Sequence, residues 1–133
     1  MSRENVEVVR LWWEGLSEHG MPPRDLSDES MVIRNVAETP LQGPYRGYEG
    51  ACQWAADIFE VVEQARFKLE ESIDVGDGER VVTMQRLLGE AAHTRLDIDY
   101  LWAAVWTIRN GRILSAQGYA TRSEALEAVG LSE

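Results

Sequence analysis

The stretch YLWAAVWTIRNGRI, residues 100–113, decides the fold. Its apolar run predicts the centre of a long strand over residues 95–109. Asn110 and Gly111 both tolerate positive φ, so they predict a tight hairpin turn. A second strand then returns over residues 112–120. The sequence therefore places an antiparallel hairpin, with an unusually apolar first strand, near the end of the chain.

Both faces of the 95–109 strand are apolar. Alternation divides its centre into two rows: Trp102, Ala104 and Trp106 on one face, and Leu101, Ala103 and Val105 on the other. A strand with two apolar faces is covered on both sides. We predict that helices cover one of the two faces. No helix is left for the other face, so we predict that a second copy of the chain covers it in a homodimer.

Helices precede most of the strands. Apolar residues at spacings of three and four predict helices over residues 3–17 and 48–64. Between them, MVIRN predicts a short strand over residues 31–35, and a single helical turn is expected around Leu26.

Period-two alternation dominates the second half of the chain. It predicts strands over residues 67–75 and 79–88, with a hairpin turn at GDG between them. Thr121 and Glu124 have capping-box spacing, and they predict a short final helix. Helices followed by an antiparallel meander predict an α+β fold, with residues 1–133 in a single domain.

The charge balance excludes several classes of partner. The chain has 13 basic and 23 acidic residues, a net charge of −10, and no basic cluster. We therefore expect no nucleic acid partner and no binding to a membrane. The first 13 residues enter a charged helical pattern without a long apolar run, so we expect no signal peptide and a cytoplasmic location. The single Cys52 allows no internal disulfide.

Five segments carry a resemblance to a known superfamily. They are ENVEVVRLWWEGL, PYRGYEGACQW, SIDVGDGERVV, AAVWTIRNGRI and YATRSEALEAVG. Their order and spacing resemble the nuclear transport factor 2-like superfamily, in its SnoaL-like, polyketide cyclase-like branch. The resemblance implies a cone-shaped, curved antiparallel sheet that wraps around the N-terminal helices and leaves an apolar pocket. The superfamily includes ketosteroid isomerase, scytalone dehydratase, limonene epoxide hydrolase and non-catalytic binders, so the fold names no function.

The resemblance also implies which side chains face the pocket. Trp102 and Trp106 fall on the inward face of the third long strand, and Trp54 matches an aromatic pocket position of the isomerases. Trp12 matches the isomerase tyrosine that donates to the oxyanion. An indole N–H donates a hydrogen bond but is no acid at neutral pH. The indoles therefore either wall a pocket or fill the cone as core.

The catalytic groups of the resembling enzymes are missing. The isomerase general base matches Asn35, and its second acid matches Ala104. The catalytic arginine and aspartates of the epoxide hydrolases match Gln85, Leu87 and Gly118. Amides have no pKa suited to proton abstraction, although they orient carbonyl and hydroxyl groups. No histidine has a partner at ligand spacing, so we expect no metal and no cofactor.

These observations predict a SnoaL-like domain that binds a small apolar or polycyclic molecule. Trp12, Asn35 and Gln85 orient its polar group, and Trp54, Trp102 and Trp106 wall the pocket. Two alternatives stay open: an isomerase, cyclase or epoxide-hydrolase-type enzyme with a non-standard base, and a protein-interaction module. The sequence leaves open whether the chain is catalytic, and it names neither ligand nor reaction.

Overall fold

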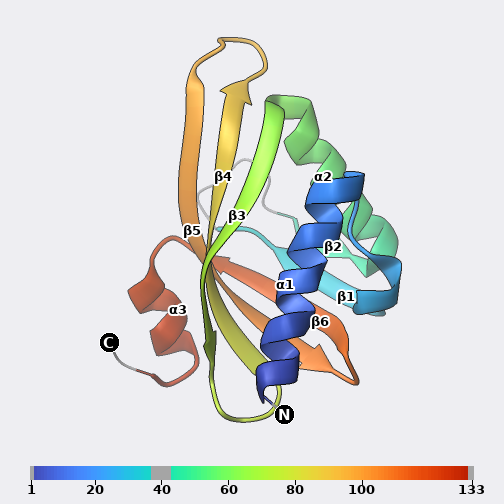
Figure 1. Ribbon diagram of the computed structural model, residues 1–133, viewed down its shortest axis with the longest axis vertical. Helices are drawn as coiled ribbons and strands as arrows, with labels where there is room; N and C mark the ends of the chain where they lie inside the picture. The colour runs from blue at the N-terminus through green and yellow to red at the C-terminus, as the bar shows by residue number, and fades with distance from the viewer. Residues whose placement is uncertain (1, 37–42, 132–133) are drawn as a thin grey trace.

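A mixed sheet with helices on both faces organises the molecule (Figure 1). The computed structural model describes residues 2–36 and 43–131. Its elements are α1 (Ser2–His19), the single-turn η1 (Arg24–Leu26), β1 (Ser27–Arg34), β2 (Tyr45–Arg46), α2 (Gly47–Val61), β3 (Val62–Asp74), β4 (Arg80–Ala91), β5 (Asp97–Arg109), β6 (Arg112–Tyr119) and α3 (Arg122–Ala128). The predicted α+β class and the cone-type fold are confirmed. None of the helices in these residues is both long and apolar enough to cross a bilayer.

The sheet has the strand order β2-β1-β6-β5-β4-β3. Strands β3 to β6 form the predicted antiparallel meander, but β1 pairs with β6 in parallel. The prediction of a purely antiparallel sheet is therefore wrong. The pairing of β1 joins segments about 80 residues apart, and local alternation carries no information on the direction in which such strands meet.

The turns follow the local sequence signals. Asn110 and Gly111 adopt φ values of 56° and 74°, as the hairpin prediction requires. The side chain of Thr121 accepts a hydrogen bond from the backbone N–H of Glu124, and the reciprocal bond completes the capping box of α3. Because these signals act between neighbouring residues, tertiary packing leaves the predicted turn and helix cap unchanged.

Several element boundaries differ from the prediction, and two of them show why. The helix predicted over residues 48–64 ends at Val61, and β3 begins directly at Val62, which is already extended with φ −125° and ψ 115°. Strand β1 begins at Ser27 rather than at residue 31, because Ser27 pairs with Ile113 of β6. In both cases strand pairing extends a strand into residues whose own propensities are ambiguous.

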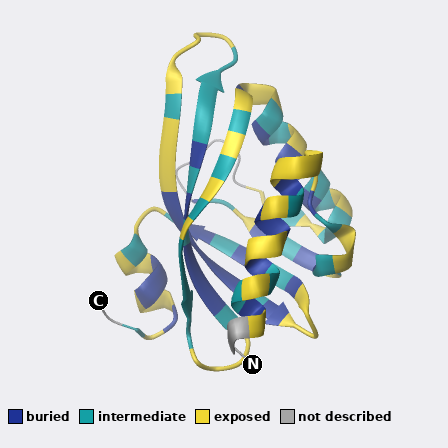
Figure 2. Ribbon diagram, viewed as in Figure 1, coloured by how far each residue is buried: buried dark blue, intermediate teal, exposed yellow. Residues whose placement is uncertain are grey.

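The apolar side chains form two clusters on opposite faces of the sheet. The larger cluster lies between the sheet and the helices α1 and α2, and it contains all five tryptophans. The smaller cluster lies between the other face and α3. It consists of Val82, Ala103, Val105, Ala125, Leu126 and Val129. Figure 2 shows β5 exposed toward the β4–β5 turn and buried along its second half, where both clusters meet it.

The second cluster corrects the argument for a partner subunit. Helix α3 covers Ala103 and Val105, so the premise that no helix remains for this face is wrong. The short helix packs back because Ala125, Leu126 and Val129 form an apolar stripe. Leu101, next to the covered residues, stays 40% exposed. The homodimer remains a prediction, with a smaller apolar surface to support it.

Candidate functional site

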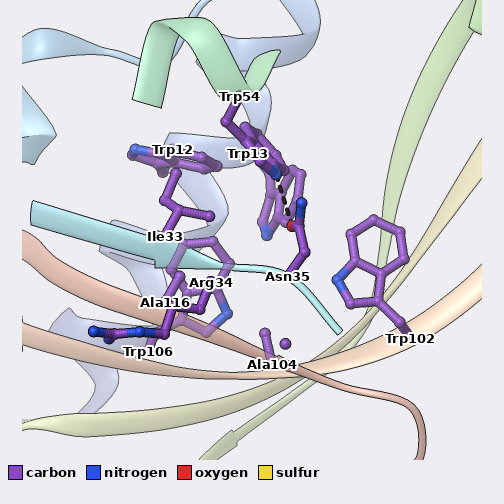
Figure 3. Close-up of a pocket in the computed structure, with 11 residues that line it drawn as sticks. Trp12, Trp13, Ile33, Arg34, Asn35, Trp54, Trp102, Ala104, Trp106 and Ala116 are labelled. Atoms are coloured by element: carbon purple, nitrogen blue, oxygen red, sulfur yellow. Dashed lines mark hydrogen bonds between the residues drawn. The ribbon is translucent and has the colours of Figure 1, made fainter. Parts of the chain in front are cut away.

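The concave face of the sheet and the helices α1 and α2 enclose a small cavity (Figure 3). Its volume is about 20 Å³, enough for roughly one water molecule. The lining residues are Trp12, Trp13, Ile33, Arg34, Asn35, Trp54, Trp102, Ala104, Trp106, Ala116 and Gly118. The cone is therefore aromatic as predicted, and its side chains nearly fill it.

Three elements bring the tryptophans together. Helix α1 contributes Trp12 and Trp13, α2 contributes Trp54, and β5 contributes Trp102 and Trp106, which share a face because they are four residues apart on a strand. The ring centroids of Trp12 and Trp106 lie 5.2 Å apart, and those of Trp13 and Trp106 lie 5.6 Å apart, both edge to face. This is the preferred geometry and spacing of aromatic pairs, so the same indoles both stabilise the core and wall the cavity.

Asn35 stands at the end of β1, beside Trp54. The Trp54 Nε1 donates to the Asn35 Oδ1 at 2.9 Å, and the dashed line in Figure 3 marks this bond. Strand β1 approaches β6 closely here. A Cβ on Gly118 would lie 2.9 Å from the backbone nitrogen of Val36, so this position requires glycine. The close approach places the amide of Asn35 at the cavity.

Trp12 has a different hydrogen-bond partner from the expected one. Its Nε1 donates to the Ser27 Oγ at 3.1 Å, and that hydroxyl donates in turn to the Pro23 carbonyl at 2.7 Å. The expectation that Trp12 donates to a ligand does not fit this arrangement. Trp12 lines the cavity as an apolar wall, and the bond to Ser27 fixes its orientation.

Gln85 belongs to a buried polar chain behind the cavity lining. The Trp106 Nε1 donates to the Thr83 Oγ1 at 2.7 Å, and the Thr83 hydroxyl donates to the Gln85 Oε1 at 2.5 Å. Gln85 is fully buried and faces inward, opposite Trp102 on β5, but it does not line the cavity itself. Among the described residues its Nε2 has no hydrogen-bond partner, and neither has the Nε1 of the buried Trp13.

Trp13 is the residue that sequence reasoning missed. It lines the cavity, but the helical stripe of α1 assigned it to the core alone. Its aromatic contacts include Phe67, at 5.1 Å between centroids. The consecutive tryptophans were the available signal: on a helix, neighbours turn about 100° apart, so both are buried only where the surroundings enclose the helix broadly.

General acid and base groups are missing from the cavity lining. None of the described lining residues is a carboxylate or an imidazole, and Ala104 faces the cavity between the two β5 indoles. The nearby Tyr45 hydroxyl donates to Asp57 at 2.7 Å, and burial, followed by this hydrogen bond, raises the pKa of Tyr45 to about 12. Tyr45 therefore stays protonated at neutral pH and lies outside the cavity lining.

The outward-facing charges pair with one another. Arg86 binds Glu70 at 3.0 Å and also binds Asp99. The hydrogen bond that Arg86 donates to Asp99 contributes most to raising the pKa of Arg86. Within the described part of the chain, no three His, Cys, Asp or Glu side chains are grouped to hold a metal ion.

Residues 8–116 match the family model of the SnoaL-like domain. The chain belongs to the SnoaL-like family. No curated protein matches its sequence. The solved structures that it resembles confirm the nuclear transport factor 2-like fold of this SnoaL-like domain.

Three of these structures cover nearly the whole SnoaL-like domain. Bal32a from a soil-derived mobile gene cassette has a TM-score of 0.79 at 18% identity, over 96% of this chain and 97% of that one. TerC, co-crystallised with polyporic acid, has a TM-score of 0.70 at 17% identity, over 95% and 98%. RV0760c from Mycobacterium tuberculosis, in complex with estradiol-17β-hemisuccinate, has a TM-score of 0.72 at 12% identity, over 90% and 95%. At these identities the likeness shows the fold alone.

Proposed function

We propose that this SnoaL-like domain binds a small apolar or polycyclic molecule between the indoles of its cone. The observation that carries the proposal is the convergence of all five tryptophans on one cavity with no carboxylate or imidazole in its described lining. Aromatic walls with few polar groups are typical of small-molecule sites. The complexes of TerC and RV0760c with polyporic acid and estradiol-17β-hemisuccinate add support from proteins of the same fold.

The size of the cavity sets a condition on binding. A space of about 20 Å³ admits no ring system, so a ligand must displace a side chain. Trp102 is the best placed to move. Its ring stacks on the partly exposed Tyr100 at 5.2 Å, and in the view of Figure 3 it stands across from Trp12, Trp54 and Trp106. Outward rotation of Trp102 opens an indole-sized space between Trp13 and the sheet.

The remaining site residues take distinct roles in this proposal. Trp54 and Trp106 stack against the ligand, Asn35 orients its polar group, and Trp12 forms the floor. Gln85 reaches the ligand once Trp102 moves. Because Asn35 replaces the isomerase base and an amide cannot abstract a proton, we propose binding rather than isomerase-type catalysis.

Tryptophan emission tests this function directly. We expect at least one member of a panel of steroids, terpenes and aromatic ketones to quench or shift the emission with saturation. The variant Trp102→Ala should bind such ligands more tightly, because the displacement is no longer needed. Leu101→Ala, on the opposite face of the same strand, is the matched control and should bind as the wild type does. No saturable change in the folded wild type or in folded Trp102→Ala would overturn the proposal.

A protein-interaction module is the second candidate, on a separate observation. The nearly filled cone comes with exposed apolar side chains near the β4–β5 turn, where Leu96, Tyr100 and Leu101 gather on one hairpin.

We also propose that the exposed Leu101 side of β5 joins two copies in a homodimer. Light scattering should then give twice the 15.0 kDa chain mass, and Leu101→Glu should give the mass of a folded monomer. A wild-type monomer would remove this proposal.

A further inference from the structure

We infer that the cone takes a neutral carbonyl compound, whose oxygen accepts hydrogen bonds from the Trp13 Nε1 and the Gln85 Nε2. The inference rests on the proposed function and names the chemical class of its ligand. The two atoms are the buried side-chain donors that lack a partner in the described chain.

Trp13 differs from its neighbours in this respect. The N–H groups of Trp12, Trp54 and Trp106 each donate to a side-chain oxygen of this chain. Trp13 is only 5% exposed, yet its N–H donates to no group of residues 2–36 and 43–131. An unpaired buried donor lowers the folding equilibrium constant by about 5- to 150-fold, so an acceptor from outside the chain is favoured there.

The orientation of the Gln85 amide follows from Thr83. The Thr83 oxygen accepts from Trp106, and its single proton is donated to the Gln85 Oε1. Turning the amide over would let the Thr83 oxygen accept from the Gln85 amide with its second lone pair, but it would leave both the Thr83 proton and the Gln85 oxygen without these partners. The observed orientation leaves only the Nε2 unpaired, so the interior has surplus donors and needs an acceptor.

Both donors border the space that Trp102 occupies. Gln85 lies directly opposite Trp102 in the β4–β5 ladder, and directly opposite side chains on one face touch. The ring of Trp13 lies 6.2 Å from that of Trp102. The movement of Trp102 that admits a ligand therefore uncovers the Gln85 amide and opens space beside the ring of Trp13.

The surroundings favour a neutral oxygen over a carboxylate. The buried polar residues of the described chain are Asn5, Ser27, Thr83 and Gln85, none of them charged. Arg34 borders the cavity, but it is exposed on a strand position whose parity points outward. A buried anion would therefore lack a counter-charge, and the net charge of −10 opposes its entry. Ketones, quinones and lactones supply the acceptor without that cost.

Indanone and indane form the matched ligand pair for a test. They have the size of an indole and differ by the carbonyl oxygen. Titrations of the wild type and of Trp102→Ala should show indanone binding about 5- to 150-fold more tightly than indane. Indane carboxylate should bind more weakly than indanone. In Trp13→Phe and in Gln85→Met the ratio of indanone affinity to indane affinity should shrink toward unity, and in Leu101→Ala the ratio should stay as in the wild type.

The indole N–H resonances in NMR spectra give a readout that a purely structural role would not move. The Trp13 signal, assigned by its loss in Trp13→Phe, should move downfield with indanone and not with indane. Equal affinity for the two compounds, or equal movement of this signal, would overturn the inference and leave the proposed function standing. Failure of both compounds to bind the folded wild type and folded Trp102→Ala would overturn both.

Discussion

The two faces of β5 bury their side chains in different ways. Toward α1 and α2, the strand presents Trp102 and Trp106, and the packing around them leaves a cavity and two unpaired donors. Toward α3, it presents Ala103 and Val105, and every buried neighbour in that cluster is aliphatic. The same short stretch of β5 backbone thus supports a polar, imperfectly filled interior on one face and a dry aliphatic one on the other.

This difference indicates that the α3 face of β5 is packed for stability alone, whereas the cone face is not. The α3 face follows the rules for a stable core: small aliphatic side chains and no buried polar atom among the described members of the cluster. The cone face departs from those rules at Trp13 and Gln85. Buried polar groups without hydrogen-bond partners are expected at functional sites, where a ligand supplies the partner and completes the packing.

A carboxylate introduced into the cone should have the largest effect. The wild type should not isomerise a β,γ-unsaturated ketone above background, because Asn35 is no base. Asn35→Asp keeps the acceptor for Trp54 and places a carboxylate, the group that proton abstraction needs, beside the apolar cavity. General-base assistance is worth about 10²–10⁴-fold, so the variant should convert the ketone measurably, and adding Ala104→Asp should increase the rate. Absorbance of the conjugated product measures it.

The matched control places the same group on the other face. Leu101→Asp should leave the rate at background, because its carboxylate lies away from the cone. Substantial wild-type activity would mean that another residue is the base. An inert Asn35→Asp that is folded and still binds a ketone would mean that the carboxylate does not reach the reacting carbon.

Val105→Glu should produce the largest loss of stability. Val105 lies beneath α3, where a carboxylate has no partner, and an uncompensated buried charge costs about 3–5 kcal/mol. Leu101→Glu, four residues earlier on the same face, should change the free energy of unfolding of the monomer by less than about 0.5 kcal/mol. Urea unfolding measures both. Similar losses in the two variants would contradict the assignment of α3 as the cover of Val105.

The local signals on β5 and its neighbours were sufficient for much of the fold. Asn110-Gly111 and the Thr121–Glu124 pair act within a few residues, so their structures follow from the sequence directly. The alternation likewise put Trp102 and Trp106 on one face of β5, and the family resemblance implied that this face is the inside of the cone, where both indoles lie. These features depend on backbone geometry that neighbours in sequence already determine.

Features that depend on distant contacts were harder to predict. The parallel pairing of β1 with β6 and the docking of α3 on Val105 join parts of the chain that no local pattern connects. The partner of the Trp12 N–H is Ser27, on the next element, and the unpaired state of Trp13 appears only once every neighbour is placed. Assigning a hydrogen-bond partner requires the coordinates, whereas the parity of a residue on its strand already tells which side chains share a face.

A pair of substitutions within the cone should show how much stability an indole N–H contributes when it has a hydrogen-bond partner and when it has none. Trp106→Phe and Trp13→Phe remove the same part of an indole ring. Trp106→Phe also breaks the bond to Thr83, whereas Trp13→Phe removes an N–H that has no partner. Trp106→Phe should therefore lower the free energy of unfolding by about 1–2 kcal/mol more than Trp13→Phe does. Equal losses in urea unfolding would mean that Trp13 has a partner, such as a buried water.

The smallest expected effect lies outside both faces, in the β3–β4 turn. Neither cluster contains a charged residue among its described members, so the pH dependence of stability should come from sites such as Asp77. The hydrogen bond from the Arg80 side chain at 2.6 Å, and then those from the backbone N–H groups of Glu79 and Arg80, lower the pKa of Asp77 to about 2. A lowered folded-state pKa contributes stability above the ordinary value of 3.8. That contribution is lost as the pH falls toward 2.

Asp77→Asn isolates this term, because the amide oxygen still accepts from the turn while the charge is gone. The pair with Arg80 is about one-third exposed, so solvent screening limits the loss at pH 7 to less than about 1 kcal/mol. The gap between wild type and variant should close between pH 4 and pH 2, the window that the two pKa values define. Asp74→Asn is the control: Asp74 accepts from the Gly76 N–H in the same turn and has no ion pair within the described residues. A gap for Asp77→Asn that stays constant over this window in urea unfolding would show that the charge of Asp77 contributes nothing, and that the pH dependence has its source elsewhere.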